Sequence, residues 1–221
     1  MRLLDDPPLS WRVDQGDSDV LQIGLFVRDA AGLDISGLDV PGALDIPPLA
    51  GISVADVAVD LRAAGQQWAS WWQQLLEVQF ADRPAPAPGV DRGRNRARYL
   101  LARWQAVCDP PDFDALADRP ELQAAAQAVF DDHHVWGRLL PQRRTELDWA
   151  LLKQTAEDVA FDHRVSIDRV RAHIVFLPVD GVWWARVRPG CVLCSAAAVD
   201  DPVTAQTLVR DAFVSGLAVP Q

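Results

Sequence analysis

Through the middle of the chain, apolar residues recur every three or four positions, the spacing of one buried helix face. The longest series runs from Val54 to Val78 and predicts a helix over about residues 53–79, with Ser53 as its N-cap. Gly65 falls inside this helix, where glycine is expected to bend or weaken it. Further helices are predicted over about residues 95–108, 119–136 and 141–161, the second capped by Asp118 with Pro120 in its first turn.

The pattern changes to strand-like runs toward the C-terminus. "AHIVFLP" and "VWWARVR" flank the turn "VDG" and predict a β-hairpin, and "CVLCSAAA" predicts a third strand. A final helix is predicted after the Asp200–Asp201 cap, with Pro202 in its first turn and Gly216 near its end. Near the N-terminus, "LSWRV" and "VLQIGLFV" predict two paired strands, and the Pro/Gly-rich stretch that follows predicts a surface strap.

Together these elements predict an α+β fold. We expect a mainly helical middle region, a small antiparallel β-sheet made of the C-terminal hairpin or meander and open to an N-terminal strand, and a C-terminal helix. The 221 residues suffice for one good core, so a single domain is expected over 1–221. Within it, 1–50 form the strap, 51–165 the helical region, and 166–221 the hairpin or meander with its helix.

The net charge of the chain limits the kinds of partner that it can bind. The chain has 31 acidic and 21 basic residues and a net charge of −10, so its summed field repels phosphate. The negative charge argues against nucleic acid and anionic membranes. It is accounted for by solubility, and a basic protein partner is the alternative. No apolar run approaches the roughly 20 residues of a membrane span, and the opening "MRLLDDPPLSW" lacks a signal-peptide core. With three cysteines, which do not make a disulfide framework, the expected compartment is the cytoplasm. The scarcity of lysine beside abundant arginine, aspartate and alanine is typical of a GC-rich bacterial genome.

The stretch "VFDDHHVW" gathers potential metal ligands. His133 belongs to the apolar face of its predicted helix, and His134 flanks that face. Adjacent residues are about 100° apart on a helix, whereas metal-binding helices space histidines four apart. We interpret His133 as a core residue, with a ligand or acid–base role as the alternative.

Cys191 and Cys194 form the chain's single C-x-x-C motif. On a strand, residues three apart point to opposite faces, so we interpret the pair as buried structural thiols. The alternatives are a redox pair or a zinc site completed by His133, His163 or Cys108. No cofactor is therefore expected, and zinc is the alternative.

Two further patches are candidates for binding. Arg92, Arg94, Arg96 and Arg98, followed by Arg103, fall near a predicted helix N-terminus, where cations are disfavoured unless acids or an anionic ligand compensate them. The other patch is the predicted outer face of the sheet, where Trp184 lies with Arg186 and Arg188 as a partner-binding surface. Five other tryptophans are predicted to be core: Trp68, Trp71, Trp104, Trp136 and Trp149.

The sequence has no P-loop, G-x-G-x-x-G, G-x-S-x-G, H-E-x-x-H or EF-hand loop. The function most consistent with these features is a non-catalytic acidic protein-binding module of a bacterial cytoplasm, either an adaptor or an immunity- or antitoxin-like neutraliser. One alternative is a zinc-dependent hydrolytic enzyme built from His133, His134, His163 and the Cys191–Cys194 pair. Another is a nucleotide- or nucleic-acid-binding regulator that uses the segment 92–103. The oligomeric state is not indicated by the sequence.

Overall fold

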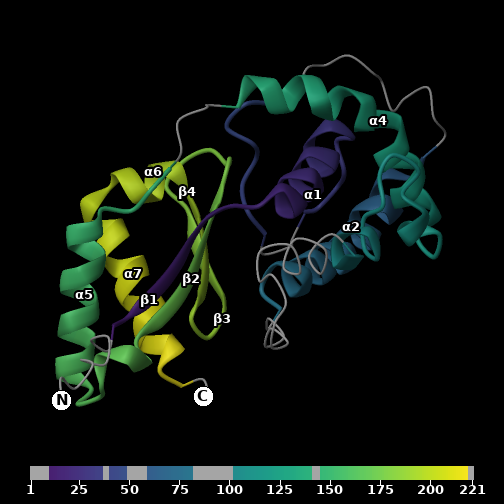
Figure 1. Cartoon of the computed structure of the whole chain (residues 1–221). Coiled ribbons are helices and arrows are strands. Elements are labelled where there is room, and N and C mark those ends of the chain that lie inside the picture. The colour runs from purple at the N-terminus through teal and green to yellow at the C-terminus, as the bar shows by residue number, and fades with distance from the viewer. Residues whose placement is uncertain (1–9, 37–39, 49–58, 82–101, 141–144, 219–221) are drawn as a thin grey trace, which may run out of the picture. The chain divides into compact units, whose positions relative to one another are not determined.

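The computed structural model describes residues 10–36, 40–48, 59–81, 102–140 and 145–218. The chain divides into two compact units (Figure 1). Unit 1 comprises residues 1–17, 143–177 and 181–221, and unit 2 comprises residues 18–142 and 178–180. In sequence, unit 2 is therefore inserted between the first strand of unit 1 and its remaining elements. The predicted α+β class with a C-terminal helix is confirmed.

Unit 1 contains a four-stranded mixed sheet in the order β1-β2-β4-β3. The strands are β1 (Arg12–Asp17), β2 (Arg171–Leu177), β3 (Trp184–Arg188) and β4 (Cys191–Ser195). β2 pairs in parallel with both β1 and β4, and β3 pairs antiparallel with β4. The N-terminal strand does join the sheet, as expected. The sheet is mixed and not antiparallel as expected, because β2 runs parallel to both of its neighbours. The predicted hairpin of β2 and β3 does not form, because β4 lies between them.

The helices of unit 1 cover one face of this sheet (Figure 1). They are α5 (Trp149–Asp162), the short α6 (Ala196–Asp200) and α7 (Pro202–Gly216), with a 3-10 turn η3 (Ile167–Arg169) leading into β2. As predicted, α7 has Pro202 in its first turn, and the Asp201 side chain accepts a hydrogen bond from the Thr204 N–H. α5 begins later than the predicted residue 141 and is capped by Asp148.

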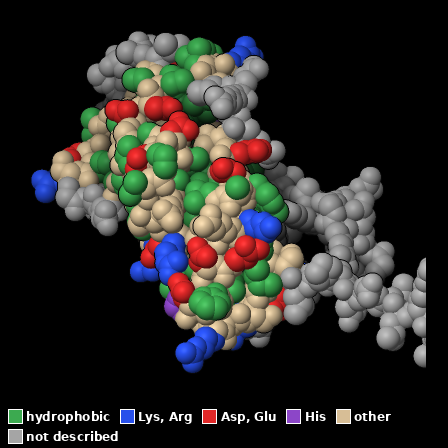
Figure 2. Space-filling view, turned by 90° about the vertical axis from the view of Figure 1, so that its left-hand side faces the viewer, with side chains coloured by type: hydrophobic (Ala, Val, Ile, Leu, Met, Phe, Trp, Pro, Cys, Tyr) green, Lys and Arg blue, Asp and Glu red, His purple; other side chains and the backbone are tan. Residues whose placement is uncertain are grey.

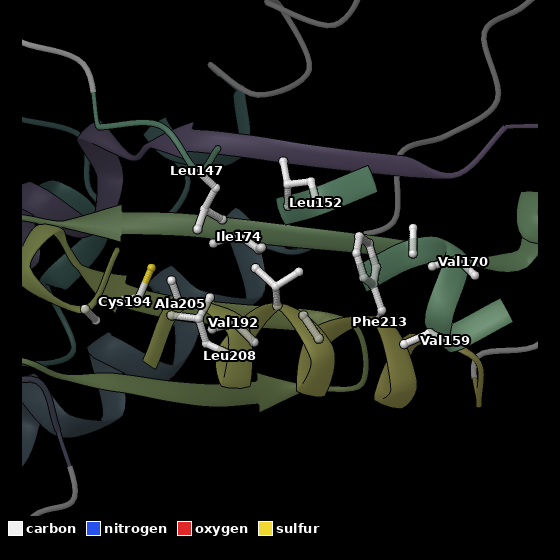
Figure 3. Packing of buried hydrophobic residues seen from close by; sticks show 14 of the residues in the cluster. Leu147, Leu152, Val159, Val170, Ile174, Val192, Cys194, Ala205, Leu208 and Phe213 are labelled. Carbon is white, nitrogen blue, oxygen red and sulfur yellow. The ribbon is translucent and has the colours of Figure 1, made fainter. Parts of the chain in front are cut away.

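The core of unit 1 lies between α5, α7 and the sheet (Figure 3). Alternation along β2 directs Ile174 and Phe176 toward the helices, and the paired positions on β4, Val192 and Cys194, face the same way. The helices supply Leu152, Val159, Leu208 and Phe213, among others. Burying an apolar side chain of this size stabilises the fold by roughly 1.5–3 kcal/mol.

Unit 2 is helical. Its main helices are α1 (Asp19–Ala30), α2 (Leu61–Gln79) and α4 (Pro120–Leu139), which pack on one another, and a 3-10 turn η2 (Asp114–Leu116) contacts α4. The strand predicted at "VLQIGLFV" is wrong: this segment is α1, whose N-cap Ser18 accepts a hydrogen bond from the Leu21 N–H. A short apolar run fits either a buried helix or a buried strand, so the pattern alone does not decide.

Helix ends also differ from the predictions. Among the described residues the long helix begins at Leu61 and is capped by Asp60, whereas Ser53 lies outside the described residues. α4 has Pro120 in its first turn, as predicted, but its N-cap is Arg119 and not Asp118. Of the helix expected at 95–108, residues 102–105 are helical and those before 102 fall outside the described part.

Three tryptophans form the centre of unit 2, and each indole N–H has a partner. Trp68, Trp71 and Trp136 are buried, and they donate to the carbonyls of Gly24, Val107 and Ile46 at 2.7, 2.6 and 2.8 Å. Their prediction as core residues is confirmed. Trp104 is half-buried, whereas Trp149 is 65% exposed, so its core assignment is wrong.

Candidate functional site

The histidine pair lies in the second half of α4. His133 is half-buried on the face of α4 that meets α1, with its ring centroid 5.1 Å from that of Phe26 and 5.8 Å from that of Trp136. It also stacks on Phe130 at 5.7 Å with an interplanar angle of 8°. His134 is exposed, with its ring centroid 5.9 Å from that of His133. This arrangement matches the interpretation of His133 as a packing residue.

Burial, reinforced by the neighbouring His134, lowers the pKa of His133 to about 4 and outweighs the opposing effect of Asp19. The ring is therefore neutral at pH 7. Its Nδ1 is buried without a hydrogen-bond partner among the described residues. A histidine with so low a pKa is a poor general base near neutral pH, because it binds a proton weakly.

The two cysteines of the C-x-x-C motif lie on opposite faces of β4. Cys194 belongs to the core under the helices, whereas Cys191 is paired in register with His173 and is half-buried. Burial raises the pKa of Cys194 to about 12, and burial together with Asp109 raises that of Cys108 to about 12. Both groups are protonated thiols at pH 7, which is neither the metal-binding nor the nucleophilic form.

Within the described parts of the chain, no group of three or more histidine, cysteine, aspartate or glutamate side chains is placed to hold a metal ion. His163, the remaining candidate ligand, is the exposed C-cap residue of α5. Zinc binding by His133, His134, His163, Cys191 and Cys194 stays a prediction. The arginine patch of Arg92, Arg94, Arg96 and Arg98 falls outside the described residues.

The predicted partner-binding face of the sheet is covered by helices. Trp184 is paired in register with Cys194 and packs against the core beneath the helices. Arg186 forms an ion pair with Asp211 of α7 at 3.0 Å. The strand pairing is irregular between Arg186 and Arg188, where β3 has a bulge. Trp184 is therefore half-buried on the face that the helices cover and not on the outer face, where it was expected, whereas Arg186 is exposed. A partner-binding role for Trp184, Arg186 and Arg188 stays a prediction.

A buried charged group that the sequence reasoning missed lies in unit 2. Arg28 is 2% exposed and forms an ion pair with the adjacent Asp29. Its Nη1 and Nη2 each donate to a carbonyl oxygen, of Pro41 and Gly42 respectively, at 2.6 Å. Asp29 accepts from the Leu44 N–H at 2.7 Å. The two side chains thus fix the segment 41–44 to α1. The signal that could have identified them is a charged pair directly after the apolar run "IGLFV".

A second missed feature is an acidic loop before α4, which we call the 109–118 loop. Asp112, Asp114 and Asp118 are exposed on it, while Phe113 is buried against Trp71 and Phe130. From α4, two glutamines donate to the loop's carbonyls: Gln123 to Phe113 at 3.1 Å and Gln127 to Asp112 at 2.6 Å. These hydrogen bonds tie the backbone at Asp112 and Phe113 to α4.

In unit 1, large apolar side chains reach the solvent from the helices. Phe161 of α5 is 84% exposed, Val203 of α7 is 74% exposed, and Trp149 rests on Trp11 at a ring-centroid distance of 4.6 Å. Figure 2 shows apolar side chains on this side of the molecule, interspersed with acidic and basic ones. The apolar spacing of α5 gave no sign of the exposed phenylalanine.

A comparison of this chain with protein-family models, with curated proteins and with solved structures finds no match in any of the three. No helix in the described ranges has both the length and the apolarity needed to cross a membrane. The functional proposal therefore depends on the charges, burial and contacts of the residues described above.

Proposed function

We propose that this chain is a non-catalytic protein-binding module that recognises a basic partner protein through the surface of unit 2. The observation that carries the proposal is the distribution of charge. Acids and bases nearly balance in unit 1, whereas acids clearly outnumber bases in unit 2. A surface with one sign of charge accelerates and orients association with a surface of the opposite sign.

The excess of acidic over basic residues is larger still among the exposed side chains in the described part of unit 2. In the described part of unit 2, the exposed basic side chains are Arg62 and Arg138, since Arg28 is buried in its ion pair. Exposed acidic side chains are far more numerous: Asp19, Asp34, Asp45, Asp60, Glu77, Asp112, Asp114, Asp118, Asp131 and Asp180. The backbone at Asp112 is hydrogen-bonded to α4, which reduces the conformational entropy that this part of the loop would lose on binding.

The proposal is tested by purifying the chain with its native partner and measuring affinity against salt. We expect a partner with a basic surface and an affinity that falls about tenfold or more between low and moderately high ionic strength, because salt screens exposed charges. A partner without a basic surface, or an affinity insensitive to salt, would contradict the proposal.

A matched pair of variants locates the surface. The double variant Asp112→Asn/Asp114→Asn removes two exposed charges from unit 2, and Glu146→Gln/Asp200→Asn removes two exposed charges from unit 1. We expect the first to slow association and weaken binding several-fold, and the second to leave both nearly unchanged. Equal effects would mean that total charge matters and not the surface of unit 2. No observation among the described residues favours the zinc-enzyme or nucleotide-binding alternatives.

A further inference from the structure

The outward surface of α5 and α7 combines exposed apolar side chains with charges of both signs. Phe161 and Val203, the two most exposed large apolar residues in the described part of the chain, lie on these two helices. Lys153 and Glu157 of α5 approach each other at 3.9 Å, and Arg210 of α7 pairs with Asp162 of α5 at 2.7 Å. All four charged side chains are about half exposed. We call Phe161, Glu157, Asp162 and Arg210 the α5–α7 patch.

The distribution of charge over the chain indicates which kind of partner can bind the α5–α7 patch. Two copies of a chain with a net charge of −10 repel each other over most of their surfaces. That repulsion is smallest where the charges balance, and in this chain the balanced part is unit 1. A uniformly basic partner would place its charges against Lys153 and Arg210 as well as against the acids, so it would gain little here. A surface carrying both signs beside an apolar centre suits a copy of itself.

The order of groups across α5 fits a two-fold contact. At 3.6 residues per turn, Glu157 lies about 40° to one side of Phe161, and Asp162 about 100° to the other side. Because Asp162 pairs with Arg210, the basic group lies on the Asp162 side. A two-fold axis that lies in the contact plane near Phe161, perpendicular to the line from Glu157 to Arg210, exchanges the two sides. It then places Arg210 of one copy opposite Glu157 of the other, twice. Isologous interfaces require this kind of self-complementarity.

We propose that the α5–α7 patch is a self-association surface and that the partner seated on it is a second copy of this chain. The two Phe161 side chains meet at the centre and exclude water, and the Arg210 and Glu157 side chains pair across the rim. This contact uses unit 1 and is independent of the basic partner proposed for unit 2.

The test is the oligomeric state of the full chain, measured by sedimentation velocity and light scattering over a wide range of concentrations. We expect the mass to rise from monomer toward dimer with concentration. Phe161→Ser is expected to raise the dimer dissociation constant about tenfold or more, since it removes the apolar centre. Val135→Ser, at a 46% exposed apolar residue of α4 in unit 2, is the control and should leave dimerisation unchanged.

A charge swap tests the pairing itself and does not depend on the phenylalanine. Arg210→Glu and Glu157→Arg are each expected to weaken self-association, because each places like charges opposite one another. Mixing the two variants restores complementary pairs and should give heterodimers. A chain that stays monomeric at all concentrations, a dimer insensitive to Phe161→Ser but sensitive to Val135→Ser, or a mixture that fails to recover association would each overturn the proposal.

Discussion

Arg28 illustrates how one buried charge is tolerated when every side of it is compensated. Its guanidinium has the Asp29 carboxylate and the carbonyls of Pro41 and Gly42 as acceptors, and it lies 5.7 Å from the Trp68 ring centroid. Hydrogen bonds to an ionised group are stronger than neutral ones, and a planar guanidinium serves several acceptors at once. Removing the guanidinium leaves Asp29 with the Leu44 N–H as its donor and takes the side-chain donor from the carbonyls of Pro41 and Gly42.

We therefore expect Arg28→Ala to destabilise the protein by about 3 kcal/mol, because the Asp29 carboxylate and two backbone carbonyls lose their guanidinium donors. Arg28→Lys should recover only part of the loss, since an ammonium group does not match the bidentate geometry. Chemical denaturation measures both effects, with exposed Arg62→Ala as the control. A loss below about 0.5 kcal/mol for Arg28→Ala, typical of a surface site, would contradict this account.

The lowered pKa of His133 makes the stability of the fold depend on pH. Its ordinary pKa of 6.5 falls to about 4 in the folded protein, so between these values the unfolded chain binds the proton more tightly. Its contribution to stability is complete above pH 6.5 and is lost as the pH falls toward 4. Allowing for the partial exposure of the ring, we expect this loss to be about 2 kcal/mol.

Denaturation curves collected across that pH range, for the parent and for His133→Phe, isolate this contribution. The variant keeps an aromatic ring beside Phe26 and Phe130 but does not titrate, so it should lose less stability on acidification. His134→Gln, at the exposed neighbour, should retain most of the parent's pH dependence. Identical profiles for parent and His133→Phe would refute the assignment.

At the scale of elements, close backbone contacts decide which helix glycines are replaceable. Gly65 of α2 lies under the chain at Asp34, and a Cβ built there would come within 2.0 Å of the Asp34 carbonyl oxygen. Gly137 of α4 has open space around it, with nothing within 4 Å of a Cβ. The sequence predicts that Gly65 weakens its helix, but only the structure shows the close backbone contact that this glycine permits.

We expect opposite signs for the two alanine substitutions. Gly137→Ala should stabilise by up to about 1 kcal/mol through helix propensity. Gly65→Ala should destabilise by about 1–3 kcal/mol, because the contact is with backbone, which yields only by shifting the segment around Asp34. Thermal or chemical denaturation gives both values, and a stabilised Gly65→Ala variant would show that the close approach has no energetic consequence.

At the scale of the whole molecule, each unit is made of more than one segment of chain. Val179 lies between β2 and β3 of unit 1 but forms an isolated β-bridge with Leu44 in unit 2. The Asp45 and Asp180 N–H groups donate to Pro178 and Ala43 on either side of that bridge. Unfolding one unit therefore changes the constraints on chain that belongs to the other.

From this we expect a single cooperative transition, in keeping with the prediction of one domain over 1–221. Far-ultraviolet circular dichroism and tryptophan fluorescence should give coincident thermal curves, since a two-state unit loses helices and core together. Two resolved transitions, one of them shifted by Arg28→Ala and the other not, would show that units 1 and 2 unfold separately.

Patterns within a few residues of sequence predicted the helical regions, a helix start and the faces of one strand. The three-and-four spacing identified the helical regions of α2, α4 and α5, the Asp201–Pro202 pair set the start of α7, and strand alternation placed Cys191 and Cys194 on opposite faces. The packing role of His133 was also predictable, because its position in the apolar series is a property of its own helix. These features depend on residues a few positions apart.

Tertiary structure decided everything that depends on which distant segments meet. The same apolar run could have been a strand and became α1 because it packs among α2 and α4. β4 came to lie between β2 and β3, and the helices cover the face that carries Trp184, which local alternation alone had placed on the outside. Trp149 and Phe161 reached the solvent, and Arg28 found its acceptors across 13 and 14 residues of chain. Periodicity gives the direction of a side chain relative to its own element, whereas exposure and pairing depend on the neighbour that each face finds.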